Sequence, residues 1–182
     1  MSKIALTPNA SGSGTFTIAA PNSDTDRTLT LPDEAGTILT SGRTGAVLQV
    51  VTGSTTTFLQ KDSGDGWVAT GIKATITPSS TSSKIVVLGS INGTGTSADS
   101  CRINFRLYRG GSSIADLYDG LYSNQTLSNL SASLQYEDSP SSTAALEYEF
   151  YLDVDNSGNA FLNNYASSQN TRSQITLMEI AG

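Results

Sequence analysis

The sequence predicts an all-β protein in which a short extended N-terminal β arm precedes an antiparallel, jelly-roll-like β-sandwich. Serine and threonine make up more than a quarter of the 182 residues, and only 14% of the residues are charged. Apolar residues recur at every second position in short segments, the period of a strand with one buried face. Glycine, proline and asparagine separate these segments, as is typical of turns. No helical period persists across this punctuation.

Residues 1–45 form the predicted arm, with short strands in the segments KIAL, TFTIAA, RTLTL and GTIL. About 45 residues with so few large side chains cannot bury enough surface to fold alone. Cys101 is the only cysteine, so no intrachain disulfide is available to stabilise the arm. We therefore expect the arm to be stabilised by association with other chains. The apolar residues expected to dock or oligomerise are Ile4, Leu6, Phe16, Ile18, Leu29, Leu31, Ile38 and Leu39.

Residues 46–182 form the predicted sandwich domain. Its expected strands cover residues 47–51, 71–77, 84–88, 102–109, 145–154, 160–164 and 173–180. Short strands at this spacing are typical of a two-sheet sandwich, most often of jelly-roll type. In residues 84–88 the four residues after Lys84 are apolar at consecutive positions, which predicts a central strand covered on both faces. Residues 117–134 are ambiguous, because leucines at helical spacing alternate with Gly120 and many serines, which favour loop and strand.

The two clearest strands are 102–109 and 145–154. Their predicted inward residues are Ile103, Phe105 and Leu107 in the first and Leu146, Tyr148, Phe150, Leu152 and Val154 in the second. The outward residues of the first strand are basic and those of the second are acidic. We therefore expect ion pairs across strands or subunits, each contributing about 0–1 kcal/mol at an exposed site.

The charge balance narrows the possible partners. The formal net charge is −6 and the pI is near 4.4, which disfavours nucleic-acid phosphate and anionic membranes as partners. No apolar run approaches the length of a membrane span, so membrane insertion is not expected. The first residues do not form a signal peptide, so synthesis in a cytoplasm is expected. Cys101 is expected to be a buried or edge thiol.

No catalytic, cofactor or metal site is expected. The sequence contains no histidine, which excludes a Ser-His-Asp set and a metal site of the Cys/His type. Glu147 and Glu149 are expected to face solvent together on one strand, without the burial that general acid or base catalysis would need. The segment Asp153–Gly158 resembles the start of a calcium loop, but its twelfth position is Asn164 rather than glutamate. A hairpin turn at residues 156–159 is the favoured interpretation.

Four residues are candidates for contact with a host surface glycan: Trp67, Tyr118, Asp119 and Tyr122. Trp67 follows two carboxylates and two glycines, and an aromatic ring can stack on a sugar. A surface hairpin anchored to the core by Trp67 is the favoured alternative. Tyr118 and Tyr122 flank Asp119-Gly120 in an expected loop, where amphipathic rings serve glycan or protein binding. Packing at the rim or at a subunit interface is the alternative.

Residues 15–42, TFTIAAPNSDTDRTLTLPDEAGTILTSG, resemble the N-terminal module of tail-fibre-like structural proteins of marine tailed bacteriophages, including those that infect cyanobacteria. Residues 75–85 and the closing 177–182 are similar to the distal domain that often follows. The LTLPDEAGTILTS stretch is the most specific part of this resemblance. The resemblance implies a homotrimeric virion protein whose front end attaches to the particle, beside other virion proteins of the tail or capsid, and whose back end forms a knob.

From this resemblance we expect a fibre or adsorption protein of the phage tail, located in the virion. The chain lacks the long shaft of a full-length fibre, so a capsid decoration or head fibre is an alternative. A stand-alone glycan-binding module is a further alternative. The arm would then carry the attachment function, whichever part of the particle it contacts.

Overall fold

A computed structural model describes residues 10–15, 17–19, 22–26, 28, 44–98, 101–123, 130–155, 158–165 and 169–182, without the side chains of 118–123, 164–165 and 169–170. The chain divides into two compact units, Met1–Thr37 and Ile38–Gly182. The domain boundary predicted after residue 45 stays a prediction.

In the first unit, the described residues form turns, bends and extended chain but no strand. Ile18 is 76% exposed, so within one chain its side chain finds little cover. The remaining predicted docking residues lie outside the described residues: Ile4, Leu6, Phe16, Leu29, Leu31, Ile38 and Leu39. Most of the four strands predicted for the arm also falls outside the description.

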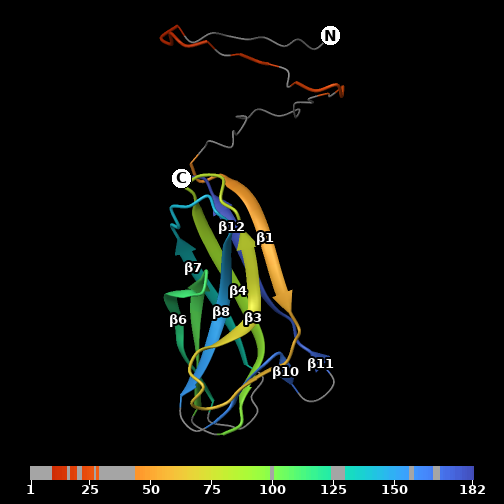
Figure 1. Ribbon diagram of the computed structural model, residues 1–182, viewed down its shortest axis with the longest axis vertical. Helices are drawn as coiled ribbons and strands as arrows, with labels where there is room; N and C mark the ends of the chain where they lie inside the picture. The colour runs from red at the N-terminus through yellow and green to blue at the C-terminus, as the bar shows by residue number, and fades with distance from the viewer. Residues whose placement is uncertain are drawn as a thin grey trace. The chain divides into compact units, whose positions relative to one another are not determined.

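The second unit contains two antiparallel β-sheets arranged as two layers (Figure 1). The strands of the first sheet are β1 (Val47–Thr55), β12 (Ser173–Ile180), β4 (Lys84–Thr96), β7 (Leu130–Asp138), β9 (Ala160–Leu162) and β2 (Leu59–Lys61). β1 pairs with β12, and β12 pairs with β4. The far edge of β4 pairs with β7 along most of its length and with β9 at its end. β4 is therefore a central strand, as predicted.

The second sheet has the order β3-β8-β5-β6. Its strands are β3 (Val68–Ile76), β8 (Leu146–Asp155), β5 (Cys101–Arg109) and β6 (Ser112–Ser123). A separate two-stranded ribbon joins β10 (Asn164–Tyr165) to β11 (Gln169–Asn170). No α-helix occurs among the described residues. The predicted all-β class and antiparallel sandwich are thus confirmed for this part of the chain.

Alternating side chains explain why these segments form strands. In β3, buried and exposed residues alternate without a break from Ala69 to Ile76, because successive side chains point to opposite faces of a sheet. The inward residues predicted for β5 are all buried, and in β8 Leu146 is half-buried while the other four are buried. Residues 117–134, ambiguous from the sequence, include the end of β6 and the start of β7.

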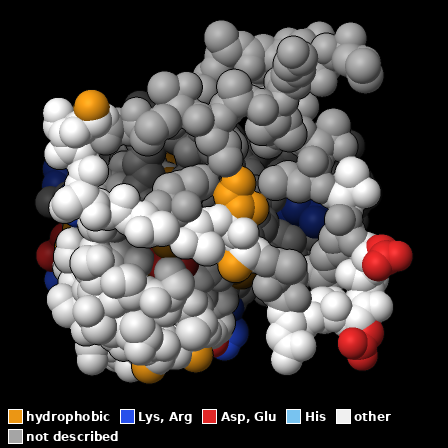
Figure 2. Space-filling view, turned by 90° about the horizontal axis from the view of Figure 1, so that it is seen from above, with side chains coloured by type: hydrophobic (Ala, Val, Ile, Leu, Met, Phe, Trp, Pro, Cys, Tyr) orange, Lys and Arg blue, Asp and Glu red, His pale blue; other side chains and the backbone are white. Residues whose placement is uncertain are grey.

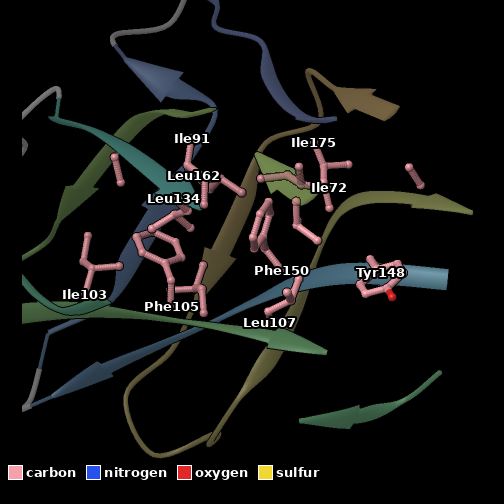
Figure 3. Packing of buried hydrophobic residues seen from close by; sticks show 14 of the residues in the cluster. Ile72, Ile91, Ile103, Phe105, Leu107, Leu134, Tyr148, Phe150, Leu162 and Ile175 are labelled. Carbon is pink, nitrogen blue, oxygen red and sulfur yellow. The ribbon is translucent and has the colours of Figure 1, made fainter. Parts of the chain in front are cut away.

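The core lies between the two sheets. Figure 3 shows Phe105, Leu107 and Phe150 of the second sheet facing Leu134 and Ile175 of the first. All of these side chains except Leu134 have no exposed surface, and Leu134 is 4% exposed. Cys101 also belongs to this core, as a small buried residue. Burial of these apolar side chains, each worth about 1.5–3 kcal/mol, holds the layers together.

Gly89 in β4 allows a close approach between the layers. A Cβ atom at this position would lie 2.5 Å from Cζ of Phe150, which is closer than real contacts allow. The aromatic ring of Phe150 therefore occupies the space that any other residue at position 89 would need. Glycine at this position is a packing requirement rather than a turn signal.

Two predicted hairpins are absent because their flanking strands belong to different pairs. β2 pairs with β9, whereas β3 pairs with β8, so residues 62–67 connect the two sheets. β8 pairs with β3 and β5, whereas β9 pairs with β2 and β4, so residues 156–159 do not join a hairpin either. Turn-forming residues signalled a change of direction correctly, but they carry no information about which strands pair.

The chain enters the sandwich beside the place where it ends. The Gly45 amide donates to the Ala181 carbonyl at 2.7 Å, and the Ala181 amide donates to the Ala46 carbonyl at 2.8 Å. These bonds extend the β1–β12 ladder by two residues beyond the strands. The segment that follows the arm is thereby fixed to the last strand.

Candidate functional site

The outer face of the second sheet carries the candidate binding surface. Trp67, just before β3, lies against Arg106 of β5, whose guanidinium carbon is 4.1 Å from the centre of the indole ring. Arg106 also forms an ion pair with Asp116 of β6. The hydrogen bond to this carboxylate is the main reason why the pKa of Arg106 is raised above its ordinary value. Trp67 is half-buried, and it packs on an outward arginine rather than anchoring a hairpin to the core.

Two tyrosines stack beside this pair. The rings of Tyr108 on β5 and Tyr151 on β8 lie 3.8 Å apart between centres, with an angle of 20° between their planes. Arg106 and Tyr151 are direct neighbours across the β5–β8 ladder. We call the four residues Trp67, Arg106, Tyr108 and Tyr151 the aromatic surface. All four are half-buried, so each keeps part of its side chain accessible.

Charged residues border the aromatic surface. Lys73 on β3 forms an ion pair with Glu147 on β8 at 3.0 Å, and the hydrogen bond to Glu147 is the main cause that raises the pKa of Lys73. β5 and β8 are neighbours, as their opposite charges suggested, but their charged residues pair elsewhere. Arg106 bonds to β6 and Glu147 bonds to β3. Each of these strands has a second neighbouring strand, and the charged side chains pair with residues on that neighbour instead. The sequences of β5 and β8 alone do not reveal this choice of ion-pair partner.

Tyr118, Asp119 and Tyr122 lie in β6 rather than in the loop expected from the sequence. Their partners in the β5–β6 ladder are Phe105, Asn104 and Arg102, respectively. The ladder shifts register between Ile103 and Asn104, where Gly120 has no partner. This shift is a β-bulge, a frequent role of glycine within a strand. The glycine that suggested a loop therefore interrupts a strand, and the side chains of these three candidates lie outside the description.

The structure brings Trp67 together with three residues that the sequence does not predict as binding residues: Arg106, Tyr108 and Tyr151. The strand pattern predicts Arg106 as an outward residue but does not predict that two tyrosines lie beside it. Their signal was nevertheless present, because both tyrosines continue the outward positions of their strands. An outward aromatic residue on each of two adjacent strands can form a pair across the ladder.

The segment that resembles a calcium loop uses its carboxylates in other ways. The carboxylate of Asp153 forms an ion pair with Nζ of Lys61 at 3.0 Å, and the Lys61 side chain is fully buried. Asp155 accepts a hydrogen bond from Nδ2 of Asn104 at 3.1 Å. Among the described residues, no three histidine, cysteine, aspartate or glutamate side chains are placed to hold a metal ion. Within the same residues, no helix is long and apolar enough to cross a membrane.

Glu179 is a fully buried carboxylate near the end of β12. Its oxygens accept hydrogen bonds from Nε2 of Gln49 at 2.6 Å, from the amide and hydroxyl of Ser79 at 2.7 Å each, and from the hydroxyl of Ser83 at 2.7 Å. Burial alone would raise the pKa of Glu179, but these donors outweigh it and lower the pKa to about 2. Glu179 therefore fixes the β3–β4 connection to β1 and β12, as a structural tie.

Asp138 forms a second buried tie, between the two sheets. Its Oδ2 accepts hydrogen bonds from the Tyr148 hydroxyl at 2.6 Å and from Nη1 of Arg109 at 2.5 Å. Burial, followed by the nearby carboxylate, raises the pKa of Tyr148, so its hydroxyl remains a donor. Figure 3 shows the Tyr148 ring within the layer of core side chains. The Tyr148 hydroxyl and the Arg109 guanidinium thus share one carboxylate oxygen, and this joins β7 of the first sheet to β8 and β5 of the second.

Most of the described surface in Figure 2 is neither hydrophobic nor charged, as the content of serine and threonine leads one to expect.

Comparisons with known proteins add little to this description. No family model matches the chain, and no curated protein matches it. Among solved structures, two chains of infectious bursal disease virus are similar to this chain. The VP2 subviral particle has a TM-score of 0.40 and 11% identity, covering 72% of this chain and 37% of the viral one.

The corresponding chain of the Gt strain has a TM-score of 0.40 and 10% identity, covering 75% of this chain and 39% of its own length. This protein thus spans less than two fifths of either viral chain. Similarity at this level carries no argument about function.

Proposed function

We propose that this chain is a structural protein of a bacteriophage virion, and that it forms a homotrimeric fibre or adsorption protein of the tail. In this proposal the N-terminal arm attaches to the particle and the sandwich forms a knob. The resemblance of residues 15–42 to phage tail-fibre modules supports the assignment. After synthesis in the host cytoplasm, the protein would reside in the virion.

The observation that carries this proposal is the order of the long strands. Labelled B to I along the chain, β1, β3, β4, β5, β6, β7, β8 and β12 give B-I-D-G in one sheet and C-H-E-F in the other. This order supports a jelly roll, an architecture found in viral capsid proteins and lectins. The proposed jelly roll follows an arm that has no strand in its described residues. This arrangement suits a knob held at the end of an attachment segment. A capsid decoration or head fibre would use the same two parts.

Particle incorporation tests the proposal. Phage assembled with a variant lacking residues 1–42 should carry none of this protein, whereas the variant itself should still fold. A reconstruction of the intact particle would then place the protein on the tail or on the capsid. Normal incorporation of the truncated variant would contradict the attachment function of the arm, and absence of the full chain from purified particles would contradict the virion assignment.

Glycan binding is a second candidate function, favoured by the aromatic surface. Aromatic rings and flanking charged groups can stack on a sugar ring and bind its hydroxyls. We expect binding on a glycan array to be lost in Trp67→Ala and Tyr151→Ala. Phe58→Ala is the matched control, because Phe58 is also an exposed aromatic residue but stacks on Phe161 at another place. If the unaltered protein binds no glycan and does not block adsorption of phage to host cells, this candidate is wrong.

A further inference from the structure

The outer face of the first sheet carries a contiguous group of apolar side chains. We call them the outer apolar patch: Val47 and Val50 on β1, Met178 and Ile180 on β12, and Val86 and Leu88 on β4. Val47 lies opposite Ile180, and Val50 lies opposite Met178, which in turn lies opposite Val86. Residues directly opposite one another in a ladder share a face. The six side chains therefore form one continuous surface over three strands.

This patch is exposed to an unusual degree for aliphatic side chains on a sheet. Val47 and Val50 are each 56% exposed and Leu88 is 39% exposed, while the other three are half-buried. In residues 44–182, Phe58 is the one other large hydrophobic side chain described as exposed. Beside the patch, a shallow hollow of about 410 Å³ is lined by Val86 and Leu88 of β4 and by Gln135, Tyr136 and Glu137 of β7.

β4 has the pattern of a strand that is covered on both faces. Its inward residues Ile85 and Val87 are fully buried in the core, and its outward residues Val86 and Leu88 are equally apolar. Antiparallel sheets with one solvated face normally place polar residues outward. Within a single chain, nothing described covers the outward pair. The sequence of β4 thus indicates a second covering layer over this face.

The distribution of charge favours the outer face of the first sheet for contact with a second copy of this chain. The protein has a net charge of −6, so two copies repel each other wherever acidic groups meet. The outer face of the first sheet carries Lys84 and Glu137, paired with each other at 2.6 Å, and Arg172. The outer face of the second sheet is more acidic than basic: Lys73, Arg102 and Arg106 against Asp116, Glu147, Glu149, Asp153 and Asp155. A second copy of this chain is therefore repelled least at the outer apolar patch.

We propose that the outer apolar patch is the surface through which copies of this chain associate, so that it faces the axis of the homotrimer. This inference rests on the proposed function for the number of copies. The aliphatic patch offers no aromatic ring for a sugar and few cations for nucleic acid, which leaves protein as its partner. Residues 44–46 lead directly into Val47, so the patch begins at the first residue of β1.

The mass of the full-length protein in solution tests this proposal. The unaltered chain should have three times the monomer mass of 19.0 kDa by native mass spectrometry. The double variant Val50→Glu, Leu88→Glu should have the monomer mass, because the acidic groups would be brought together around the axis. Ser113→Glu, which adds a carboxylate to an exposed position of β6, is the control and should remain trimeric.

The outcomes separate this inference from the proposed function. A trimer in both the unaltered and the double-variant protein would overturn the interface but leave the trimer. A monomeric unaltered protein would overturn both. If the double variant does not fold, thiol labelling decides, because Cys101 is buried. Thr52→Cys, next to the patch on β1, should react more slowly than Ser113→Cys, and equal rates would contradict the proposal.

Discussion

At the scale of the residue, two buried carboxylates in this protein are each fixed by more than one hydrogen-bond donor. Glu179 has four donors on its two oxygens, and Asp138 has a tyrosine and an arginine on one oxygen. A buried carboxylate is costly unless its hydrogen bonds are complete. The serines of the β3–β4 connection thus act as hydrogen-bond donors to a buried carboxylate as well as turn residues.

Glu179→Gln should destabilise the fold. The substitution removes the negative charge that four donors surround and places an amide group against the amide of Gln49. We expect a loss of about 1–3 kcal/mol in the free energy of unfolding, measured by urea denaturation. Glu137→Gln is the control, because the Glu137 side chain is 56% exposed and its ion pair with Lys84 is worth about 1 kcal/mol or less.

The stability should also depend on pH through Glu179. Its pKa in the folded protein is about 2, below the value of about 4.3 for an unfolded chain. The stabilisation is therefore complete above the unfolded pKa and is lost as the pH falls from about 4 toward 2. In this window the unaltered protein should lose stability more steeply than Glu179→Gln. Parallel curves of unfolding free energy against pH would contradict the role of this group.

Gly89→Ala should cost about 1–3 kcal/mol of stability, because the new methyl group would overlap the ring of Phe150. Thermal unfolding measures this loss, and Ser90→Ala at the neighbouring exposed position should change stability by about 0.5 kcal/mol or less. In the double variant Gly89→Ala, Phe150→Leu, a smaller side chain replaces the aromatic ring. This double variant should recover part of the lost stability. If the double variant is no more stable than Gly89→Ala, the overlap is not the cause.

At the scale of the element, alternation predicts strands well and predicts their neighbours poorly. β5 and β8 follow from their two-residue period, because the inward positions of each strand are mostly apolar, and in β12 the same period places Ile175 and Leu177 inward. The same period cannot say that β8 lies between β3 and β5, because pairing depends on the whole chain. β6 was missed since Gly120 forms a bulge, and the aromatic surface was predicted only through Trp67, because its other members come from separate strands.

The contact between Trp67 and Arg106 joins the β2–β3 connection to β5. Trp67 is the only tryptophan, so tryptophan fluorescence reports on the surroundings of this one ring. Arg106→Ala should shift the emission to longer wavelength, because water replaces the guanidinium group over the ring. Arg102→Ala, a change on the same strand, should leave the emission unchanged. An unaltered spectrum in Arg106→Ala would show that the ring is shielded by other groups.

At the scale of the whole molecule, one core serves both sheets of the second unit. Ile175 and Leu134 of the first sheet contact the same layer as Phe105 and Phe150 of the second. Neither sheet can lose this layer and stay folded, so the unit should unfold cooperatively. Trp67 fluorescence and far-ultraviolet circular dichroism should give coincident unfolding curves for residues 44–182. Two separate transitions would contradict a shared core.

If the arm attaches the protein to the particle as proposed, the position of the chain's entry into the sandwich determines how load reaches the sheet. Residues 44–46 lead into β1, which is bonded to β12 along its whole length from Val47 to Thr55. A pull on the arm along the direction of β1 therefore acts on all these hydrogen bonds at once, in shear, instead of opening them one after another. β12 is itself held between β1 and β4, so the tension passes into the centre of the sheet. Such an arrangement suits a tether, since the arm would give way only when an entire strand slides.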